Sequence, residues 1–195
     1  MPEITLPYPY REFACIEADP PWQYKDRGYN GHESVQRYRI HCPYPTMSVP
    51  EVKAMAYEVR RVTAVFAHLW LWTTKDFLFD AFGVMEEWGF SYRQTFTWLK
   101  TTKAGKPTYG MGHWGRNGTE FLLLGTTCGS YKLREYTSTP NYILAPRLGH
   151  SAKPEAAYDM IRKNSPGPRL SLFQRTPRED FTCWGNELRE AVPTL

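Results

Sequence analysis

The sequence lacks the patterns that mark disulfide frameworks, zinc sites and membrane spans. Its four cysteines, Cys15, Cys42, Cys128 and Cys183, are far apart and form no C-x-x-C pair, which argues against both a disulfide framework and a zinc site. No run approaches the ~18 consecutive apolar residues of a membrane helix, and the proline-rich start is not typical of a signal peptide. We therefore expect a soluble cytoplasmic protein that binds no metal.

Composition limits the fold and the partner only loosely. A chain of 195 residues is expected to form a single domain, residues 1–195, with a sizeable core. Aromatic residues make up 15%, including seven Trp and thirteen Tyr, and the net charge is +4. A mildly basic surface of this kind permits a polyanionic partner without demanding one.

Apolar runs and helical periodicities alternate along the chain. Strands are expected over 12–18, 62–72, 92–100, 119–127, 169–175 and 181–185, and helices from about Pro50, over 75–88 and over 153–164. Ser48, with Glu51 three residues later, is typical of a capped helix start. This alternation predicts an α/β fold with a mostly parallel central sheet and helices on both faces.

The segment Asp19-Pro20-Pro21-Trp22 directly follows the first predicted strand. Two prolines end the strand because neither can donate a backbone hydrogen bond, so Asp19 is expected at the carboxyl edge of the sheet, where α/β folds bind ligands. A carboxylate and a proline carbonyl can accept the two hydrogens of an amino group, and Trp22 could stack on a base. A proline-rich turn with a capping aspartate is an equally good interpretation of the tetrapeptide alone.

Eight further landmarks follow in order. They are Tyr44-Pro-Thr-Met-Ser48, Leu71-Trp-Thr-Thr74, Trp88-Gly-Phe90, Trp98-Leu-Lys100, Gly112-His-Trp-Gly-Arg116 with Glu120, His150-Ser-Ala-Lys-Pro154, Leu172-Phe-Gln-Arg175 and Trp184-Gly-Asn-Glu187. With Asp19-Pro-Pro-Trp22 they resemble the MT-A70 family of S-adenosylmethionine-dependent adenine-N(6) methyltransferases from about residue 13 to residue 188. The resemblance implies a Rossmann-like methyltransferase fold with a catalytic core at about 12–188, and the permuted, β-class order in which the amine-handling motif precedes the cofactor strand.

The resemblance also implies roles for individual residues. The implied catalytic residues are Asp19, Pro20, Pro21 and Trp22. The implied substrate-binding residues are Tyr44, Trp72, Thr73, Lys25, Arg27, Trp114 and Arg116. The implied cofactor-binding residues are Lys100, His150, Ser151, Lys153, Phe173, Arg175, Asn186 and Glu187. The alternatives are a packing tyrosine for Tyr44 and a solvated lysine for Lys100, while from the residues alone Glu187 could equally be a helix-starting carboxylate.

The sequence departs from the family pattern in one respect that bears on the cofactor. Ser171 stands where relatives often carry Glu, so one cofactor contact is expected to differ. A G-x-G-x-x-G loop is also missing after the strand near 170, although the family does not use one.

Basic and aromatic residues gather in three predicted loops. These include Lys25, Arg27, Arg37 and Arg39 in the first, Lys103, Lys106, His113, Trp114 and Arg116 in the second, and Lys132 and Arg134 in the third. Charge mixed with stacking surface suits nucleic acid. We expect adenine-N(6) methylation of DNA, of bacterial or phage type. The alternatives are the same chemistry on RNA, or a non-catalytic nucleic-acid-binding subunit; a homodimer or a partner chain is also compatible.

Overall fold

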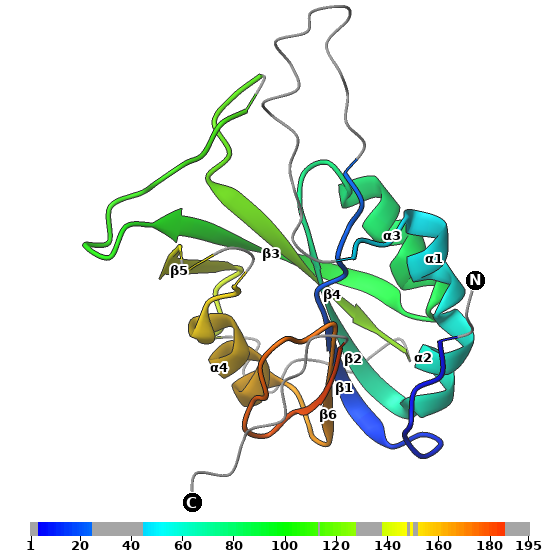
Figure 1. Ribbon diagram of the computed structural model, residues 1–195. Coiled ribbons are helices and arrows are strands. Elements are labelled where there is room, and N and C mark those ends of the chain that lie inside the picture. Colours follow the sequence, from blue (N-terminus) through cyan, green and yellow to red (C-terminus); the bar gives the residue numbers. More distant parts are fainter. Residues whose placement is uncertain are drawn as a thin grey trace, which may run out of the picture.

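A seven-stranded sheet with helices on both faces forms the molecule (Figure 1). The computed structural model describes residues 4–24, 45–112, 114–127, 138–147, 149 and 152–185. The strands are β1 (Phe13–Ala18), β2 (Thr63–Thr73), β3 (Ser91–Thr101), β4 (Thr119–Thr126), β5 (Tyr142–Pro146), β6 (Arg169–Leu172) and β7 (Thr182–Trp184). The helices are α1 (Val49–Ala54), α2 (Ala56–Val62), α3 (Leu78–Glu87) and α4 (Glu155–Asn164).

The strand order across the sheet is β5-β3-β4-β2-β1-β6-β7. Strand β4 is antiparallel to both of its neighbours, β2 and β3, and every other pairing is parallel. The predicted α/β fold with a mostly parallel sheet is therefore confirmed, and its architecture is that of a Rossmann-like methyltransferase. Strict strand–helix alternation fails where one strand follows another without a helix in the described residues: β3 and β4 are antiparallel neighbours joined through residues 102–118, and β6 is followed by β7.

The chain changes direction across the sheet between β1 and β6. Strand β1 lies between β2 and β6; the chain leaves β1 for β2 on one side and leaves β6 for β7 on the other. The connections therefore diverge above the carboxyl ends of β1 and β6. Such a switch point is where open α/β sheets bind ligands.

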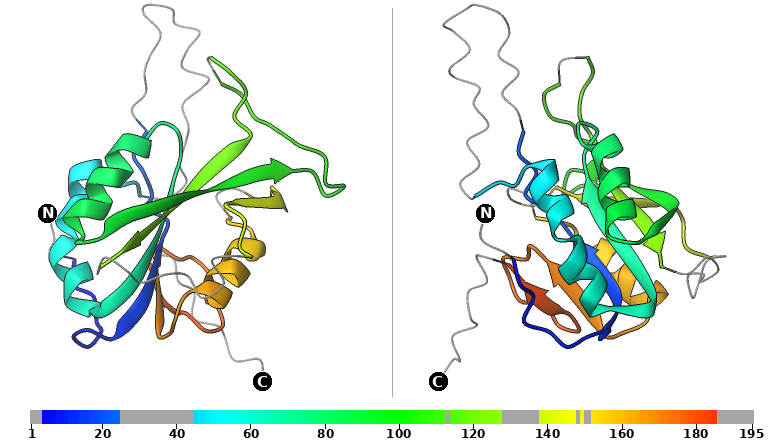
Figure 2. Two further views of the ribbon diagram at one scale, coloured as in Figure 1. Left: turned by 180° about the vertical axis from the view of Figure 1, so that it is seen from behind. Right: turned by 90° about the vertical axis from the view of Figure 1, so that its right-hand side faces the viewer.

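Two separate apolar cores cover the two faces of the sheet. On one face α1, α2 and α3 contribute Val52, Val59 and Val84 to a cluster that includes Ile16 and Leu69. On the other face α4 contributes Ala157, Tyr158 and Ile161 to a cluster built around aromatic strand residues such as Trp70 and Phe96. Figure 2 shows α4 on the opposite side of the sheet from the other three helices, which confirms the prediction of helices on both faces.

Element boundaries differ from the prediction where the backbone is irregular. The apolar strand β2 is buried along most of its length, but Val65 and Phe66 are 47% and 57% exposed. The pairing shifts between Phe13↔Thr63 and Cys15↔His68, so the residues between lie opposite no regular partner. Strand β6 ends at Leu172 rather than at 175 because Phe173 takes a left-handed φ of 65°.

The predicted helix start near Pro50 is confirmed. The Ser48 backbone N–H donates to Glu51 Oε2 at 2.7 Å, which completes the expected capping box. The first helix then breaks at Met55, which separates α1 from α2. Among the described residues, no helix has the length and apolar character needed to cross a membrane.

Gly125 allows α3 and the start of β3 to pack closely on β4. A Cβ added at this position would lie 2.8 Å from Met85 Sδ and 3.1 Å from Phe90 Cβ. We expect Gly125→Val to lower the free energy of unfolding by about 1–3 kcal/mol through overpacking, measured by urea denaturation. Gly115→Ala is the matched control, because its Cβ would meet nothing within 4 Å; a change of more than about 0.5 kcal/mol there would contradict the packing argument.

Candidate active site

The loop after β1 is held by its own backbone and by the segment before α1. The Asp19 N–H donates to the Leu172 carbonyl at 3.4 Å, which carries the β1–β6 pairing one residue further. The Pro20 carbonyl accepts from Trp22 N at 2.8 Å, and the Pro21 carbonyl accepts from Met47 N at 2.8 Å. The Asp-Pro-Pro segment is thus fixed at the switch point, as predicted.

Trp22 lies in a different environment from the one expected. Its side chain is 5% exposed, its ring is stacked on Phe77 with centroids 5.2 Å apart, and its Nε1 donates to the Trp72 carbonyl at 3.2 Å. A ring buried in this way is not available to stack on a base, which corrects that expectation. Trp22 instead anchors the Asp-Pro-Pro loop to the end of β2.

Four charged side chains form a continuous chain of ion pairs at the carboxyl edge. Lys153 Nζ, just before α4, lies 2.6 Å from Asp19 Oδ2 and 3.4 Å from Glu120 Oε2. The other Glu120 oxygen, Oε1, lies 2.6 Å from Lys100 Nζ. The order Asp19–Lys153–Glu120–Lys100 therefore alternates negative and positive charge across β1, the start of α4, β4 and β3.

Burial and pairing shift the pKa values of this chain in a consistent way. Burial raises the pKa of Asp19 even though Lys153 opposes the shift. Burial also acts to raise the pKa of Glu120, but Lys153 and Lys100 outweigh it, and the pKa of Glu120 is lowered. Lys153 loses hydration, yet Asp19 and Glu120 together raise its pKa. Lys153 therefore remains protonated, and the Asp19 carboxylate is more basic than that of an exposed aspartate.

An aromatic wall lies beside the ion pairs. Trp72 and Trp98 are 1% and 2% exposed and meet edge to face with centroids 6.3 Å apart. Lys153 Nζ lies 5.3 Å from the centre of the Trp72 ring, a cation–π contact. Trp72 Nε1 is buried and has no hydrogen-bond partner among the described residues, so a polar donor is left over at this site. Thr73 Oγ1 donates to the next carbonyl, that of Thr74, at 3.3 Å.

The turn after β6 forms the other side of the switch point. Phe173 has a φ of 65° and packs edge to face on Trp184 with centroids 5.8 Å apart. Gln174 N donates to the Trp184 carbonyl at 3.0 Å, which joins this turn to the end of β7. Arg175 is close enough to Asp19 to lower the pKa of that carboxyl.

The structure brings many of the predicted site residues to one edge of the sheet. Those that meet there are Asp19, Pro20, Pro21, Trp72, Thr73, Lys100, Lys153, Phe173 and Arg175. Trp114 is fully exposed and Arg116 Nη1 contacts Met111 Sδ, both within the β3–β4 connection that projects from the sheet (Figure 1). Lys25, Arg27, Tyr44, His150, Ser151, Asn186 and Glu187 lie outside the described residues, as do Arg37, Arg39, His113, Lys132 and Arg134.

Glu120 belongs to the site, although no role was predicted for it from the sequence. It belonged to a landmark, but its function as the bridge between two lysines depends on β4 running antiparallel beside β3, opposite Trp98. The signal available in the sequence was a carboxylate at the start of an otherwise apolar strand. No group of three or more metal-ligating side chains occurs in the part of the chain that the structure describes.

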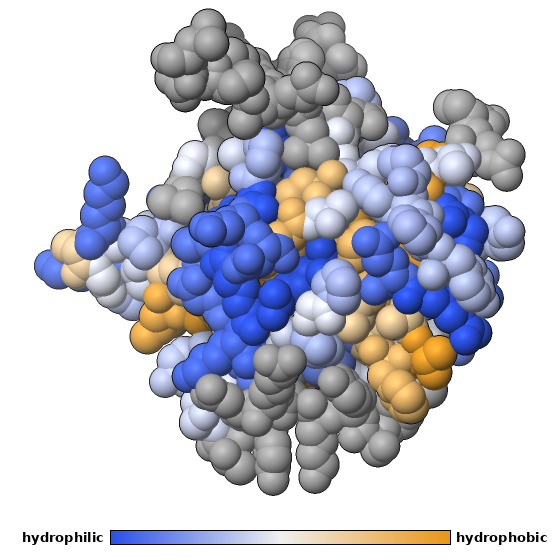
Figure 3. Space-filling model, turned by 90° about the horizontal axis from the view of Figure 1, so that it is seen from below, coloured by the Kyte–Doolittle hydropathy of each residue, from blue (hydrophilic) through white to orange (hydrophobic). Residues whose placement is uncertain are grey.

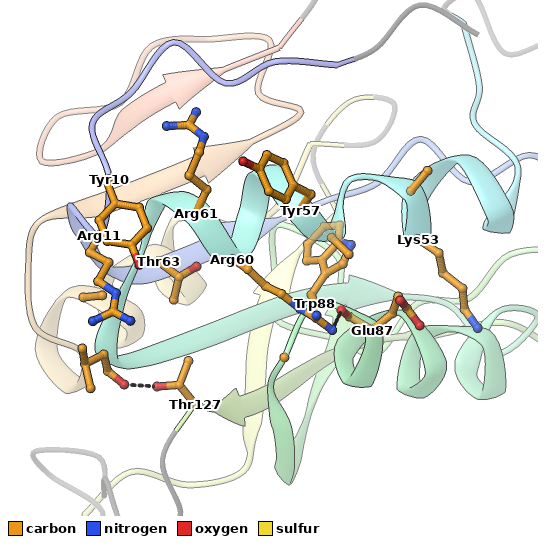
Figure 4. Close-up of a pocket in the computed structure, with 15 residues that line it drawn as sticks. Tyr10, Arg11, Lys53, Tyr57, Arg60, Arg61, Thr63, Glu87, Trp88 and Thr127 are labelled. Carbon is orange, nitrogen blue, oxygen red and sulfur yellow. Dashed lines mark hydrogen bonds between the residues drawn. The ribbon is translucent and has the colours of Figure 1, made fainter.

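A groove of about 930 Å³ lies at the opposite edge of the sheet from this site, near the amino ends of β1 and β2 (Figure 4). Arg61 is committed there to Glu58 and to the Leu6 and Tyr8 carbonyls. Arg60 donates to the Glu87 carbonyl. Figure 3 views the molecule from that side and shows hydrophobic areas beside hydrophilic ones. These two arginines hold neighbouring segments together, and the groove does not contribute to the site at the carboxyl edge.

The ion-pair chain leads to a prediction about stability. Lys153→Met leaves the Asp19 and Glu120 carboxylates without the cation between them, so we expect a loss of about 2–4 kcal/mol near neutral pH. The loss should shrink at acidic pH, because protonation of Asp19, whose pKa is already raised, removes one of the unpaired charges. Urea denaturation at both pH values measures this.

Two variants check the cause. Adding Asp19→Asn to Lys153→Met should recover part of the loss, because the second change removes an unpaired charge. Lys75→Met is the matched control, since its pair with Asp76 is half exposed and should change stability by less than about 1 kcal/mol. Strictly additive losses in the double variant would contradict the coupling.

Comparison with known proteins bears on the identity of this arrangement. The MT-A70 family model matches residues 13–187. The chain is 26% identical to the type II methyltransferase M.MunI of Mycoplasma sp, over 98% of this chain and 86% of that protein. It is 27% identical to the N(6)-adenosine-methyltransferase MT-A70-like protein of Drosophila melanogaster and 26% identical to the N(6)-adenosine-methyltransferase catalytic subunit METTL3 of Homo sapiens, over 91% of this chain in both cases. The chain spans only 27% and 28% of those two proteins. Because the matched segment covers nearly all of the sequence and the carboxyl-edge site is built from its landmark residues, the chain belongs to the MT-A70 family of adenine N(6)-methyltransferases.

Proposed function

We propose that the protein transfers a methyl group from S-adenosylmethionine to the 6-amino group of adenine in DNA. One observation carries the proposal beyond the family itself. Asp19 and Pro20 are fixed at the carboxyl ends of β1 and β6, beside a lysine that is held as a cation. A ligand bound at that switch point would contact the hydrogen-bond acceptors of Asp19 and Pro20 after β1, and the turn that follows β6.

The chain's own acceptors suit an aromatic amine. Lys153 occupies Asp19 Oδ2, and Oδ1 has no hydrogen-bond partner among the described residues. Asp19 Oδ1 and the second lone pair of the Pro20 carbonyl can accept the two N–H groups of adenine's 6-amino nitrogen. Holding both hydrogens out of the ring plane draws the nitrogen lone pair away from the ring and orients it for attack. The raised pKa of Asp19 strengthens its oxygen as an acceptor.

The residues at the site fit the proposed cofactor. When bound, S-adenosylmethionine supplies a methyl group on a positively charged sulfur. Lys153 and Lys100 are the cations near its proposed position that could hold a carboxylate, and the turn of Phe173 and Arg175 offers apolar contact and charge. The buried Trp72 Nε1 without a partner provides a further donor for a ligand. The asparagine and glutamate predicted to bind the ribose, Asn186 and Glu187, directly follow Trp184 and Gly185 in the chain.

The choice of DNA has its own support. The chain matches 86% of the type II methyltransferase M.MunI, but about a quarter of the relatives named for N(6)-adenosine. Its predicted loops carry basic and aromatic residues without a separate recognition domain in these 195 residues. RNA is the second candidate acceptor, because those N(6)-adenosine relatives match over 91% of this chain.

Asp19→Ala tests the amine clamp. We expect methyl transfer to fall by at least about a hundredfold, because an acceptor made in the transition state is lost. Binding of S-adenosylmethionine, measured by calorimetry, should remain. Asp76→Asn is the matched control, since that carboxylate is half exposed and pairs with Lys75; it should keep full activity. Equal activity of the Asp19 variant would refute the clamp, and absence of cofactor binding by the wild type would favour a non-catalytic subunit.

Side-by-side assays decide the acceptor strand. Oligonucleotides of one sequence are prepared as DNA and as RNA, each single- and double-stranded, and incubated with the protein and labelled cofactor. We expect label in the N(6) position of adenine in DNA and little in RNA. Methylation confined to RNA would reject the DNA assignment while leaving the chemistry intact.

A further inference from the structure

Glu17 is a fully buried carboxylate that the proposed chemistry does not use. It lies in the middle of the sheet on β1, is 0% exposed, and is paired directly across the parallel β1–β6 ladder with Ser171. Ionisable groups are rarely buried without a partner of opposite charge. No salt bridge to Glu17 is present among the described residues, so hydrogen bonds must stabilise it.

Three donors, from β6, the turn after it and α4, converge on the Glu17 carboxylate. Ser171 Oγ and Gln174 Nε2, the latter at 3.2 Å, donate to Oε2. Tyr158 O–H, from α4, donates to Oε1 at 3.4 Å. Gln174 Nε2 also donates to the Tyr158 oxygen at 2.8 Å. The carboxylate therefore acts as an acceptor for every neighbour, a role that its ionised form fills and its protonated form fills only in part.

Gln174 links this buried group to the turn at the cofactor end of the sheet. Its side chain is held by Glu17 and Tyr158, and its backbone N–H donates to the Trp184 carbonyl at 3.0 Å. Gly185 packs directly on the Gln174 backbone, where a Cβ could not fit. Phe173, the residue before Gln174, has a left-handed φ of 65°, a conformation that a non-glycine residue keeps only when its surroundings impose it.

We propose that Glu17 is a positioning residue for the cofactor, which acts by fixing Gln174 and so holding the Phe173–Arg175 turn in its binding conformation. The inference rests on the proposed function for the identity of the cofactor. Glu17 itself touches no reacting atom. Ser171 and Glu17 face each other in register and are joined by a hydrogen bond, so β6, which leads into this turn, is tied to the Glu17 carboxylate as well.

The charge state of Glu17 gives the proposal a measurable signature. Burial raises the pKa of Glu17 to about 7, with Asp19 adding to the shift and Ser171, Gln174 and Lys153 opposing it. The other titratable or charged groups around it are Cys15 on the same strand, Tyr158 on α4, Cys183 on β7, and Arg178, which lies over the Tyr158 ring. Because the ionised form holds Gln174, cofactor affinity should rise as the pH increases through about 7.

Glu17→Gln is the principal test. The amide keeps the size of the side chain but removes the charge and one acceptor. We expect the dissociation constant for S-adenosylmethionine to increase about tenfold at about pH 8.5, the cost of a hydrogen bond to a charged group. The ratio of variant to wild-type constants should fall toward one at about pH 5.5, where Glu17 is protonated in the wild type as well. Calorimetry at several pH values measures this ratio. Titration of the cofactor and of Asp19 affects both proteins alike and so drops out of the ratio.

Two more variants separate positioning from loss of fold. Glu58→Gln alters another buried carboxylate, which lies on α2 and accepts hydrogen bonds from Leu6 N and Arg61. This variant should lower thermal stability without changing cofactor affinity. The double variant Glu17→Ser with Ser171→Glu moves the carboxylate to the paired position on β6. We expect it to bind the cofactor more tightly than Glu17→Ser alone, because the carboxylate can again reach Gln174.

The outcomes distinguish this proposal from the proposed function. If wild-type protein binds S-adenosylmethionine and methylates adenine, but Glu17→Gln binds it equally well at every pH, the positioning role is wrong and the function stands. A constant affinity loss across the pH range would also overturn it, since that result indicates a structural role. If the wild type does not bind the cofactor at all, the proposed function fails first.

Discussion

The ion pair between Asp19 and Lys153 is the interaction on which the candidate site depends. A single charge would be unfavourable at this partly buried position. Asp19 loses hydration at the end of a central strand, and Lys153 is 8% exposed beside an aromatic ring. Together, and with Glu120 and Lys100 beyond them, they form an alternating array that keeps each charge compensated. The array joins β1, β3, β4 and the start of α4, so the fold and the site constrain each other.

The switch point explains why these groups meet. Strands β1 and β6 are neighbours whose chains depart in opposite directions, and open α/β sheets bind ligands at the carboxyl ends of strands that diverge in this way. The proposed amine acceptors follow β1 and the proposed cofactor turn follows β6, so two segments about 150 residues apart in the chain are adjacent in the sheet. Glu17 and Ser171, one step below in the same two strands, connect the halves from within the core.

Much of the fold could be predicted because local patterns determine it. The apolar run before Asp19 forms a buried strand, and the two prolines end that strand because they cannot donate backbone hydrogen bonds. Ser48 and Glu51 cap a helix start through contacts only three residues apart in the chain. The prediction for Trp22 failed because it concerned the residue's environment. Trp22 was expected to face a base, but packing on Phe77 buries it, and a single sequence does not say which aromatic ring the core will take.

The sequence by itself determined most of the order of strands and helices, the family, and the position of Asp19, Pro20 and Pro21 at the end of a buried strand, because these follow from short-range chemistry and ordered motifs. It did not predict β5 (Tyr142–Pro146). Only the tertiary structure decided which charges pair. The antiparallel direction of β4 brings Glu120 between Lys100 and Lys153, and the β1–β6 register sets Glu17 against Ser171. Both depend on contacts between strands far apart in the chain, which no local pattern records.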